Sequence, residues 1–170
     1  MVESYISVLQ KAGCTENVVA HCLSVKNTAL SIALRVTSVK LDLELIEAGA
    51  MLHDIGRSRT HGITHAVEGA RIAREMGIDE RIARIIERHI GAGIAADEAA
   101  MLGLPPGDYI PETPEEKIIA HADNLTKGHV EVSFDECLKM FEQRLGRDNP
   151  AVGRVVRLHR EIEGWMGNAA

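Results

Sequence analysis

Six side chains of the kinds that bind metal ions are spread over five segments of this chain. They are His21, His53, Asp54, His65, His89 and Asp123. Each lies at helical spacing from apolar residues and is therefore expected to face the core. A charged or imidazole group that faces a core is costly unless it is paired or bound to a metal. A lone core histidine is usually explained by a hydrogen bond to a carbonyl. One shared site would satisfy all six residues at once, so the pattern predicts a buried centre that holds two metal ions.

The types of ligand indicate which ions the centre would hold and what they would do. Neutral imidazoles and carboxylates favour iron, manganese, zinc or cobalt over calcium. Because adjacent helical residues point about 100° apart, His53 can bind one ion end-on while the carboxylate of Asp54 spans two. Two metals about 3.5–4 Å apart can hold a bridging hydroxide and neutralise a phosphoryl group during in-line displacement. The chemistry expected from these residues is hydrolysis of a phosphate ester.

Helices must position these side chains, because apolar residues recur at helical spacing almost throughout and no segment alternates convincingly as a strand. Capping residues, glycines and prolines divide the chain. For example, Thr113 and Pro114 begin a helix, and residues 103–111 form a loop rich in glycine and proline. Helices are predicted over residues 2–12, 16–36, 41–56, 65–76, 79–89, 95–102, 114–125, 134–145 and 151–165. The predicted fold class is all-α, in a single domain of residues 1–170.

Length and composition limit the class of protein. A chain of 170 residues suits one compact domain rather than two. A net charge of −6 with 3% aromatic residues argues against a nucleic-acid partner, although a bound pair of cations can still attract a small anion. No apolar run is long enough to span a membrane, and no signal peptide is evident. The three cysteines are widely spaced and suit a reducing compartment, so a cytoplasmic location is expected.

The order of the candidate ligands resembles the HD-domain superfamily of metal-dependent phosphohydrolases. The segment 52–56 reads Leu-His-Asp-Ile-Gly, which is similar to the HDIG form of its motif. The added His65 and His89 resemble the two-metal branch, and bacterial symmetrical diadenosine-tetraphosphate hydrolases use a similar order. The resemblance covers about residues 20–128. It implies an HD-domain-like helical bundle with its core at about residues 15–128, and two extra C-terminal helices follow at about residues 133–167.

The resemblance also implies how the ligands divide between the ions. The first metal would be bound by His21, His53, Asp54 and Asp123. A second metal would be completed by His65 and His89, with Asp54 bridging the two.

Three basic residues near the expected centre are candidates for binding phosphate. Arg57 and Arg59 follow the motif directly, and Lys127 lies one turn past Asp123. Many two-metal HDIG proteins carry lysine where Arg57 stands. Arginine can bind a phosphate bidentately but is effectively never a proton donor. If Arg57 acts in catalysis together with Asp54, the leaving group must take its proton from water or from another residue.

The leading prediction is a metal-dependent phosphohydrolase, either a phosphatase or a phosphodiesterase. It would act on a nucleotide or another small phosphate ester through a metal-bound hydroxide. Two alternatives use the same ligands: a di-iron oxygenase of HD fold, and a sensor that binds a nucleotide without turnover. The expected partner is a small phosphorylated substrate, with neither nucleic acid nor a membrane involved. The oligomeric state stays open, with a homodimer as one alternative.

Overall fold

The computed structural model describes residues 2–167, and this part of the chain is mostly helical, which confirms the all-α prediction. The helices are α1 (Val2–Ala12), α2 (Glu16–Ala33), α3 (Leu43–Leu52), α4 (His65–Glu75), α5 (Glu80–Glu87), α6 (Ala96–Met101), α7 (Pro114–Asn124), α8 (Phe134–Leu145) and α9 (Pro150–Trp165). A short 3-10 helix, η1 (Ile55–Ser58), follows α3. A small antiparallel hairpin pairs β1 (Thr126–Lys127) with β2 (Val130–Glu131).

Side-chain caps fix the starts of the two helices that carry the first and last candidate ligands. Thr15 caps α2 and Thr113 caps α7, each accepting a hydrogen bond from a backbone amide three residues later. Such caps satisfy backbone donors that the first helical turn leaves unpaired. Thr64 precedes α4 in the same way, but its side chain accepts no such bond.

The structure differs from the sequence prediction at two places, and both lie beside candidate ligands. The helix expected to reach Gly56 ends at Leu52, because the chain turns at His53 and Asp54 and continues as η1. The hairpin of β1 and β2 was not predicted, since strands of two residues are too short to show an alternating pattern.

The centre of the molecule is formed by α2, α3 and α7, which pack against one another. Val25, Ile46 and Ile119 come from these three helices and are buried in one apolar cluster. A second cluster lies where α1, α4 and α5 cover the other side, and it includes Leu9 and Ile86. Burying an aliphatic side chain of this size stabilises the fold by about 1.5–3 kcal/mol. The ends of these packed helices therefore form a rigid support for the ligands.

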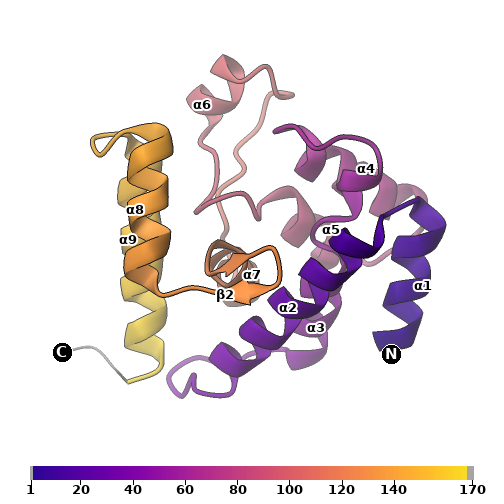
Figure 1. Ribbon diagram of the computed structural model, residues 1–170, viewed down its shortest axis with the longest axis horizontal. Coiled ribbons are helices and arrows are strands. Elements are labelled where there is room, and N and C mark those ends of the chain that lie inside the picture. The colour runs from indigo at the N-terminus through magenta and orange to yellow at the C-terminus, as the bar shows by residue number, and fades with distance from the viewer. Residues whose placement is uncertain (1, 168–170) are drawn as a thin grey trace.

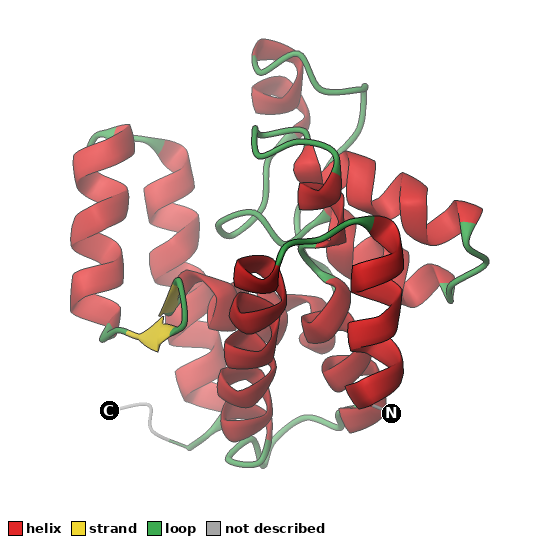
Figure 2. Ribbon diagram, turned by 45° about the vertical axis from the view of Figure 1, so that its right-hand side comes forward, coloured by secondary structure: helices red, strands yellow, loops and turns green. Residues whose placement is uncertain are grey.

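The helices α8 and α9 form a pair that stands to one side of this core (Figures 1 and 2). The pair is anchored by α9, whose Val155, Leu158 and Ile162 are buried in the same cluster as α2 and α7. The hairpin of β1 and β2 leads from α7 into α8. Among residues 2–167, no helix has both the length and the apolar composition that crossing a bilayer requires.

Candidate metal centre

The six candidate ligands come together in space from separate elements of the fold. His21 lies in α2, His53 and Asp54 lie in the turn after α3, His65 opens α4, His89 follows α5, and Asp123 lies near the end of α7. Their donor atoms form three overlapping groups, in each of which all atoms lie within 4.8 Å of one another. The helical spacing of polar residues on apolar faces therefore indicated a real cluster.

Asp54 stands between two sets of histidines. Its Oδ1 lies 3.2 Å from Nε2 of His65 and 3.3 Å from Nε2 of His89. Its Oδ2 lies 3.7 Å from Nε2 of His21 and 3.7 Å from Nε2 of His53. Each oxygen thus faces a different set, as a carboxylate that spans two ions requires.

Asp123 completes the set around His21 and His53. Its Oδ1 lies 2.9 Å from Nε2 of His21 and 3.4 Å from Nε2 of His53. Together with Oδ2 of Asp54, these residues make a set of four donors. The set around Oδ1 of Asp54 has three donors, because only His65 and His89 join it. Nitrogen and oxygen donors in such numbers suit borderline divalent ions.

The outer nitrogen of each candidate imidazole is held by the backbone. Nδ1 of His53, His65 and His89 donates to the carbonyl oxygen three residues earlier, over 2.7, 2.8 and 2.7 Å respectively. Nδ1 of His21 donates to the carbonyl oxygen of Gly128, in the turn between β1 and β2. Because a carbonyl oxygen only accepts, the proton lies on Nδ1 and the neutral ring has a lone pair on Nε2. All four rings therefore present a metal-binding nitrogen to the centre.

Several atoms at the centre have no suitable partner within the protein. The Nε2 atoms of His65 and His89 lie 3.1 Å apart, so two lone pairs face each other when both rings are neutral. Within the described residues, Nε2 of His53 and Oδ1 of Asp54 are buried without a well-formed hydrogen bond. Leaving a buried polar atom unpaired costs about 1–3 kcal/mol. Cations among these atoms would remove that cost, so the donor set fits the divalent ions predicted from the sequence.

Burial and charge act against each other on the ionisation of the centre. Desolvation is the largest single influence on the pKa of His53 and lowers it, but the combined effects of Asp54, Cys22 and Asp123 outweigh it and hold this pKa well above the ordinary value. Desolvation raises the pKa of Asp54, but the charge of His53 and the nearby rings of His65 and His89 together bring it well below the ordinary value. Without an ion the nearby carboxylates favour a protonated His53, and metal binding at this ring must displace that proton.

Gly56 gives a physical reason for the glycine of the motif. A Cβ atom at this residue would lie 1.7 Å from the carbonyl oxygen of His65 and 2.6 Å from the amide nitrogen of Gly69. The backbone of η1 therefore lies directly against the start of α4, with no space for any side chain. This close approach brings Asp54 and His65 within reach of each other.

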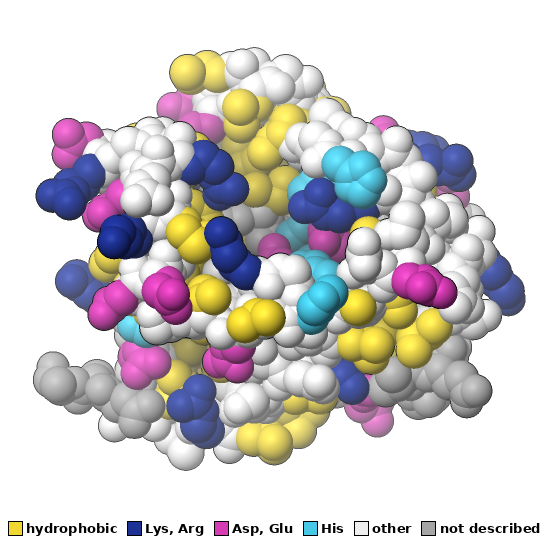
Figure 3. Space-filling model, in the orientation of Figure 1, with side chains coloured by type: hydrophobic (Ala, Val, Ile, Leu, Met, Phe, Trp, Pro, Cys, Tyr) yellow, Lys and Arg dark blue, Asp and Glu magenta, His cyan; other side chains and the backbone are white. Residues whose placement is uncertain are grey.

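The centre lies at the floor of an open cleft of about 1090 Å³. Figure 3 shows histidine and acidic side chains in this hollow, lysine and arginine side chains on its rim, and apolar side chains extending away from it. His21, His65, His89 and Asp123 line the cleft. His53 and Asp54 are almost fully buried beneath them. A cleft of this size can admit a ligand of nucleotide size.

The three basic residues predicted to bind substrate differ in their positions. Arg57 and Lys127 line the cleft. Nε of Arg57 donates to Oδ2 of Asp54 over 2.8 Å, and one of its outer nitrogens donates to the carbonyl oxygen of His61. The guanidinium thus contacts the centre directly. Arg59 is exposed and does not line the cleft, because the η1 turn carries it away from the centre.

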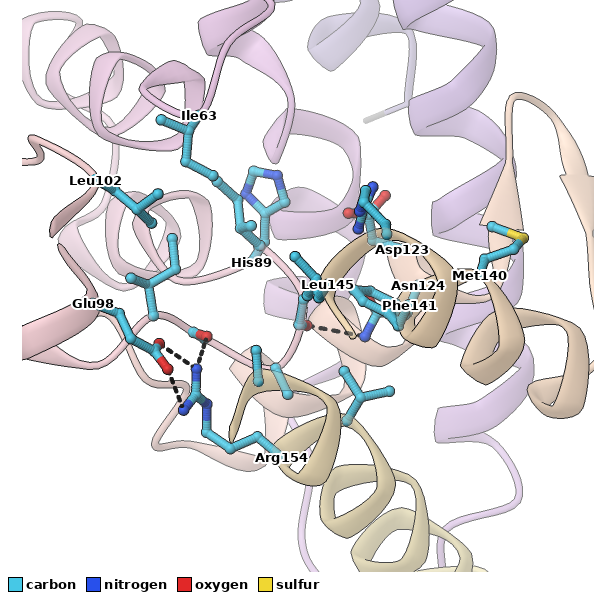
Figure 4. Close-up of a pocket in the computed structure, with 18 of the residues that line it drawn as sticks. Ile63, His89, Glu98, Leu102, Asp123, Asn124, Met140, Phe141, Leu145 and Arg154 are labelled. Carbon is cyan, nitrogen blue, oxygen red and sulfur yellow. Dashed lines mark hydrogen bonds and ion pairs between the residues drawn. The ribbon is translucent and has the colours of Figure 1, made fainter. Parts of the chain in front are cut away.

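The opposite wall of the cleft comes from the C-terminal helices, for which no functional role was predicted. Its side chains include Met140, Phe141, Arg144 and Leu145 of α8 and Arg154 of α9. Figure 4 shows Phe141, Leu145 and Asp123 among the residues that line the pocket, and Arg154 paired with Glu98. The sequence had no signal for this wall, because α8 begins beyond the segment that resembles the HD superfamily.

The remaining histidines lie outside the donor set. His121 is buried near His159, and the ring of His159 stacks on Phe134 with 3.7 Å between ring centroids. Burial lowers the pKa of His121 to about 3, so this ring stays neutral. His61 lines the cleft, and His129 is exposed.

With this geometry established, similarity to known proteins identifies the family. Residues 18–128 match the HD domain, a range that holds all six candidate ligands and more than half of the chain. The chain belongs to the HD domain family. The resemblance seen in the His-Asp motif is therefore confirmed at the level of the superfamily.

Relatives and a solved structure match nearly the whole chain. An uncharacterized protein of Methanocaldococcus jannaschii is 53% identical over 166 residues, which cover 96% of this chain and 98% of that protein. A tRNA (cytidine(56)-2'-O)-methyltransferase of Thermoplasma volcanium is 43% identical over 162 residues, 95% of this chain but 46% of the methyltransferase. The chain thus spans less than half the length of that enzyme.

The solved structure is the HD domain of the phosphodiesterase PgpH of L. monocytogenes. It matches with a TM-score of 0.53 at 18% identity, and the match covers 89% of this chain and 82% of that one. This likeness supports the fold. Family, fold and the complete His/Asp cluster together describe an HD-domain hydrolase with an intact metal site.

Proposed function

We propose that this HD-domain hydrolase uses two divalent ions to cleave a phosphate ester in a nucleotide or a similarly small phosphorylated molecule. The carboxylate of Asp54 carries the proposal, because its two oxygens face two separate sets of histidines. A site for one ion would not need His65 and His89 gathered around Oδ1. None of the three proteins compared above is a diadenosine-tetraphosphate hydrolase, so the substrate has to be argued from the cleft.

The donor set divides naturally between two ions. His21, His53, Asp123 and Oδ2 of Asp54 would hold one, and His65, His89 and Oδ1 of Asp54 would hold the other. When bound, the ions would supply Lewis-acid activation of water and would neutralise charge on the phosphoryl oxygens. The backbone carbonyls behind the imidazoles keep the donor nitrogens oriented before any ion arrives.

Arg57 lines the cleft and contacts the metal centre through Asp54. Its Nε fixes the orientation of the Asp54 carboxylate, and its outer N–H groups are available to a phosphate oxygen of the substrate. A guanidinium is effectively never a proton donor, so Arg57 stabilises negative charge and does not protonate the leaving group. The open cleft admits water, from which that proton is taken. Lys127, on the rim, adds positive charge for the incoming anion.

Two observations favour a nucleotide substrate: the lining of the cleft and the name of one relative. The cleft combines cations with exposed apolar side chains, and these would receive a phosphate and a nucleobase respectively. The Thermoplasma volcanium relative is a methyltransferase of tRNA, although this chain matches less than half of it. The cytoplasmic location and the absence of a nucleic-acid partner remain predictions.

The test is metal analysis of anaerobically purified protein, combined with a screen for phosphate release and phosphodiester cleavage over mononucleotides, cyclic nucleotides and dinucleotides. We expect close to two ions per chain and metal-dependent hydrolysis that the variant Asp54→Asn loses. The matched control is Asp148→Asn, since Asp148 is exposed and distant in sequence from every ligand.

Two outcomes would contradict the proposal. Retained iron with a mixed-valence signal and oxygen uptake would indicate the oxygenase alternative. Tight nucleotide binding without turnover in iron, manganese and cobalt would indicate a sensor.

A further inference from the structure

Some of the basic side chains that line the cleft are not paired with its carboxylates. Four basic side chains line it: Arg57, Lys127, Arg144 and Arg154. Arg57 pairs with Asp54, and Arg154 pairs with Glu98. Within residues 2–167, Lys127 and Arg144 have no carboxylate within 4.0 Å. In a chain of net charge −6, two unpaired cations on one cleft indicate a site for an anion.

Arg144 is held in the cleft by an aromatic ring. Its guanidinium carbon lies 5.1 Å from the ring centroid of Phe141, one helical turn earlier in α8, a distance at which the cation is attracted to the ring face. Phe141 in turn lies against the loop that leaves the metal centre, since a Cβ atom at Gly91 would be 3.7 Å from its Cε1. Gly91 follows the ligand His89 by two residues. The cation is therefore supported by side chains next to the centre.

The same cleft also gathers exposed apolar side chains. Ile63, Met101, Leu102 and Leu145 line it, and their exposed fractions are 38%, 86%, 49% and 39%. Figure 4 shows Ile63, Leu102 and Leu145 around the pocket. Exposed apolar side chains that cluster at one place commonly mark a binding surface. Here they would receive an apolar body such as a nucleobase.

We propose that Arg144, together with Lys127, binds a second phosphate of the substrate while the first lies at the metal centre. The placement of the first phosphate rests on the function proposed above. Phe141 and the apolar lining would contact the base between the two phosphates. The substrate class is then a nucleotide with two separated phosphate groups, as in a short oligonucleotide, and not a mononucleotide.

The test compares binding of adenosine 5′-monophosphate with binding of 5′-phosphorylated di- and triadenylates. Phosphorothioate linkages in the longer ligands prevent turnover, and titration calorimetry on metal-loaded protein measures the affinities. We expect the longer ligands to bind about 10-fold more tightly than the monophosphate, as one charge-assisted contact to phosphate would give. Arg144→Ala should remove this gain, and Lys127→Ala should reduce it.

The matched control is Arg147→Ala, which removes the same charge three residues later. Arg147 is exposed, pairs with Glu142 and does not line the cleft, so this variant should keep the full gain. Equal affinity for one and several phosphates in the unaltered protein would overturn the proposal, as would a gain that survives in Arg144→Ala. Failure of the hydrolase itself is a separate result, namely no metal-dependent cleavage of unmodified nucleotides despite the difference in affinity.

Discussion

The two walls of the cleft differ in how their functional side chains are held. On the metal side, His53, Asp54 and His89 are almost completely buried, and the imidazoles are fixed by backbone carbonyls. On the side of α8 and α9, Arg144 and Leu145 are exposed, and α8 has few buried residues. A buried donor set tolerates little movement, whereas an exposed wall can change its side chains without disturbing the core. We therefore expect reaction type to be set by the first wall and substrate choice by the second.

The largest effect is expected from removing a buried ligand. His53→Ala or Asp54→Ala should abolish metal retention, because the first leaves one set and the second leaves both sets a donor short, with the remaining polar atoms unpaired. Loss of activity should exceed the roughly 10–100-fold typical of a residue that only supports a ligand. Metal content measured by mass spectrometry after gel filtration tests this directly. Full metal content and turnover in both variants would refute the assignment.

The second-largest effect is expected on stability, from a backbone clash at Gly56. A second glycine, Gly164 in α9, provides the comparison. Gly56→Ala should destabilise the fold by more than about 4 kcal/mol or prevent folding, because the added Cβ meets backbone atoms of α4. Gly164→Ala, in the last turn of α9 with nothing within 4 Å of its Cβ, should stabilise by at most about 0.5–1 kcal/mol. Chemical denaturation of both variants gives the two free energies of unfolding. Similar values for the two would show that η1 does not pack on α4 as described.

Arg57 should affect catalysis more than stability. Arg57→Ala should lower kcat/KM by about 100-fold, as loss of one preorganised donor to a developing negative charge does, while both ions are retained. Arg57→Lys should recover part of this loss, because charge returns without the bidentate geometry. Arg59→Ala tests the prediction from the sequence that Arg59 binds substrate. Because Arg59 is exposed and lies outside the cleft, kcat/KM should change by no more than about two-fold. A larger loss from Arg59 than from Arg57 would reverse their assigned roles.

The smallest effect concerns the ion pair that joins α9 to α6. Arg154 donates to Glu98 and to the carbonyl oxygen of Gly93, and this bond lowers the pKa of Glu98 below its ordinary value of 4.5. A carboxyl whose pKa falls on folding contributes stability above its unfolded pKa and loses it as pH falls through the folded pKa. Arg154→Ala should therefore cost about 1–2 kcal/mol near pH 7 and progressively less below pH 4.5.

Thermal unfolding at several pH values measures this dependence. Arg157→Ala, an exposed position on the same helix, should show no such trend. A cost of Arg154→Ala that stays constant down to pH 3 would exclude the ion pair as its cause.

The sequence predicted the metal wall well, because each ligand is a polar residue on an otherwise apolar helical face, and that contrast is visible without a structure. It predicted the path of the chain around the motif less well. The helix after Leu41 was extended to Gly56, since nothing local shows that Gly56 must approach α4. The hairpin that presents Gly128 to His21 was also missed. The substrate wall could not be predicted, because Phe141 and Arg144 have ordinary spacing for a solvated amphipathic helix and only tertiary packing turns them toward the centre.

Three of the histidines, His53, His65 and His89, are each tethered to the carbonyl oxygen three residues earlier, and this has a further consequence. The directions of three donor nitrogens are set by short local stretches of backbone, so the pocket keeps its shape whichever cation enters. A metal site whose geometry does not adjust to the bound ion discriminates weakly among ions of similar radius and charge. We therefore expect the metal found in the cell to reflect supply, and the same protein to exchange manganese for iron or cobalt as their abundance changes.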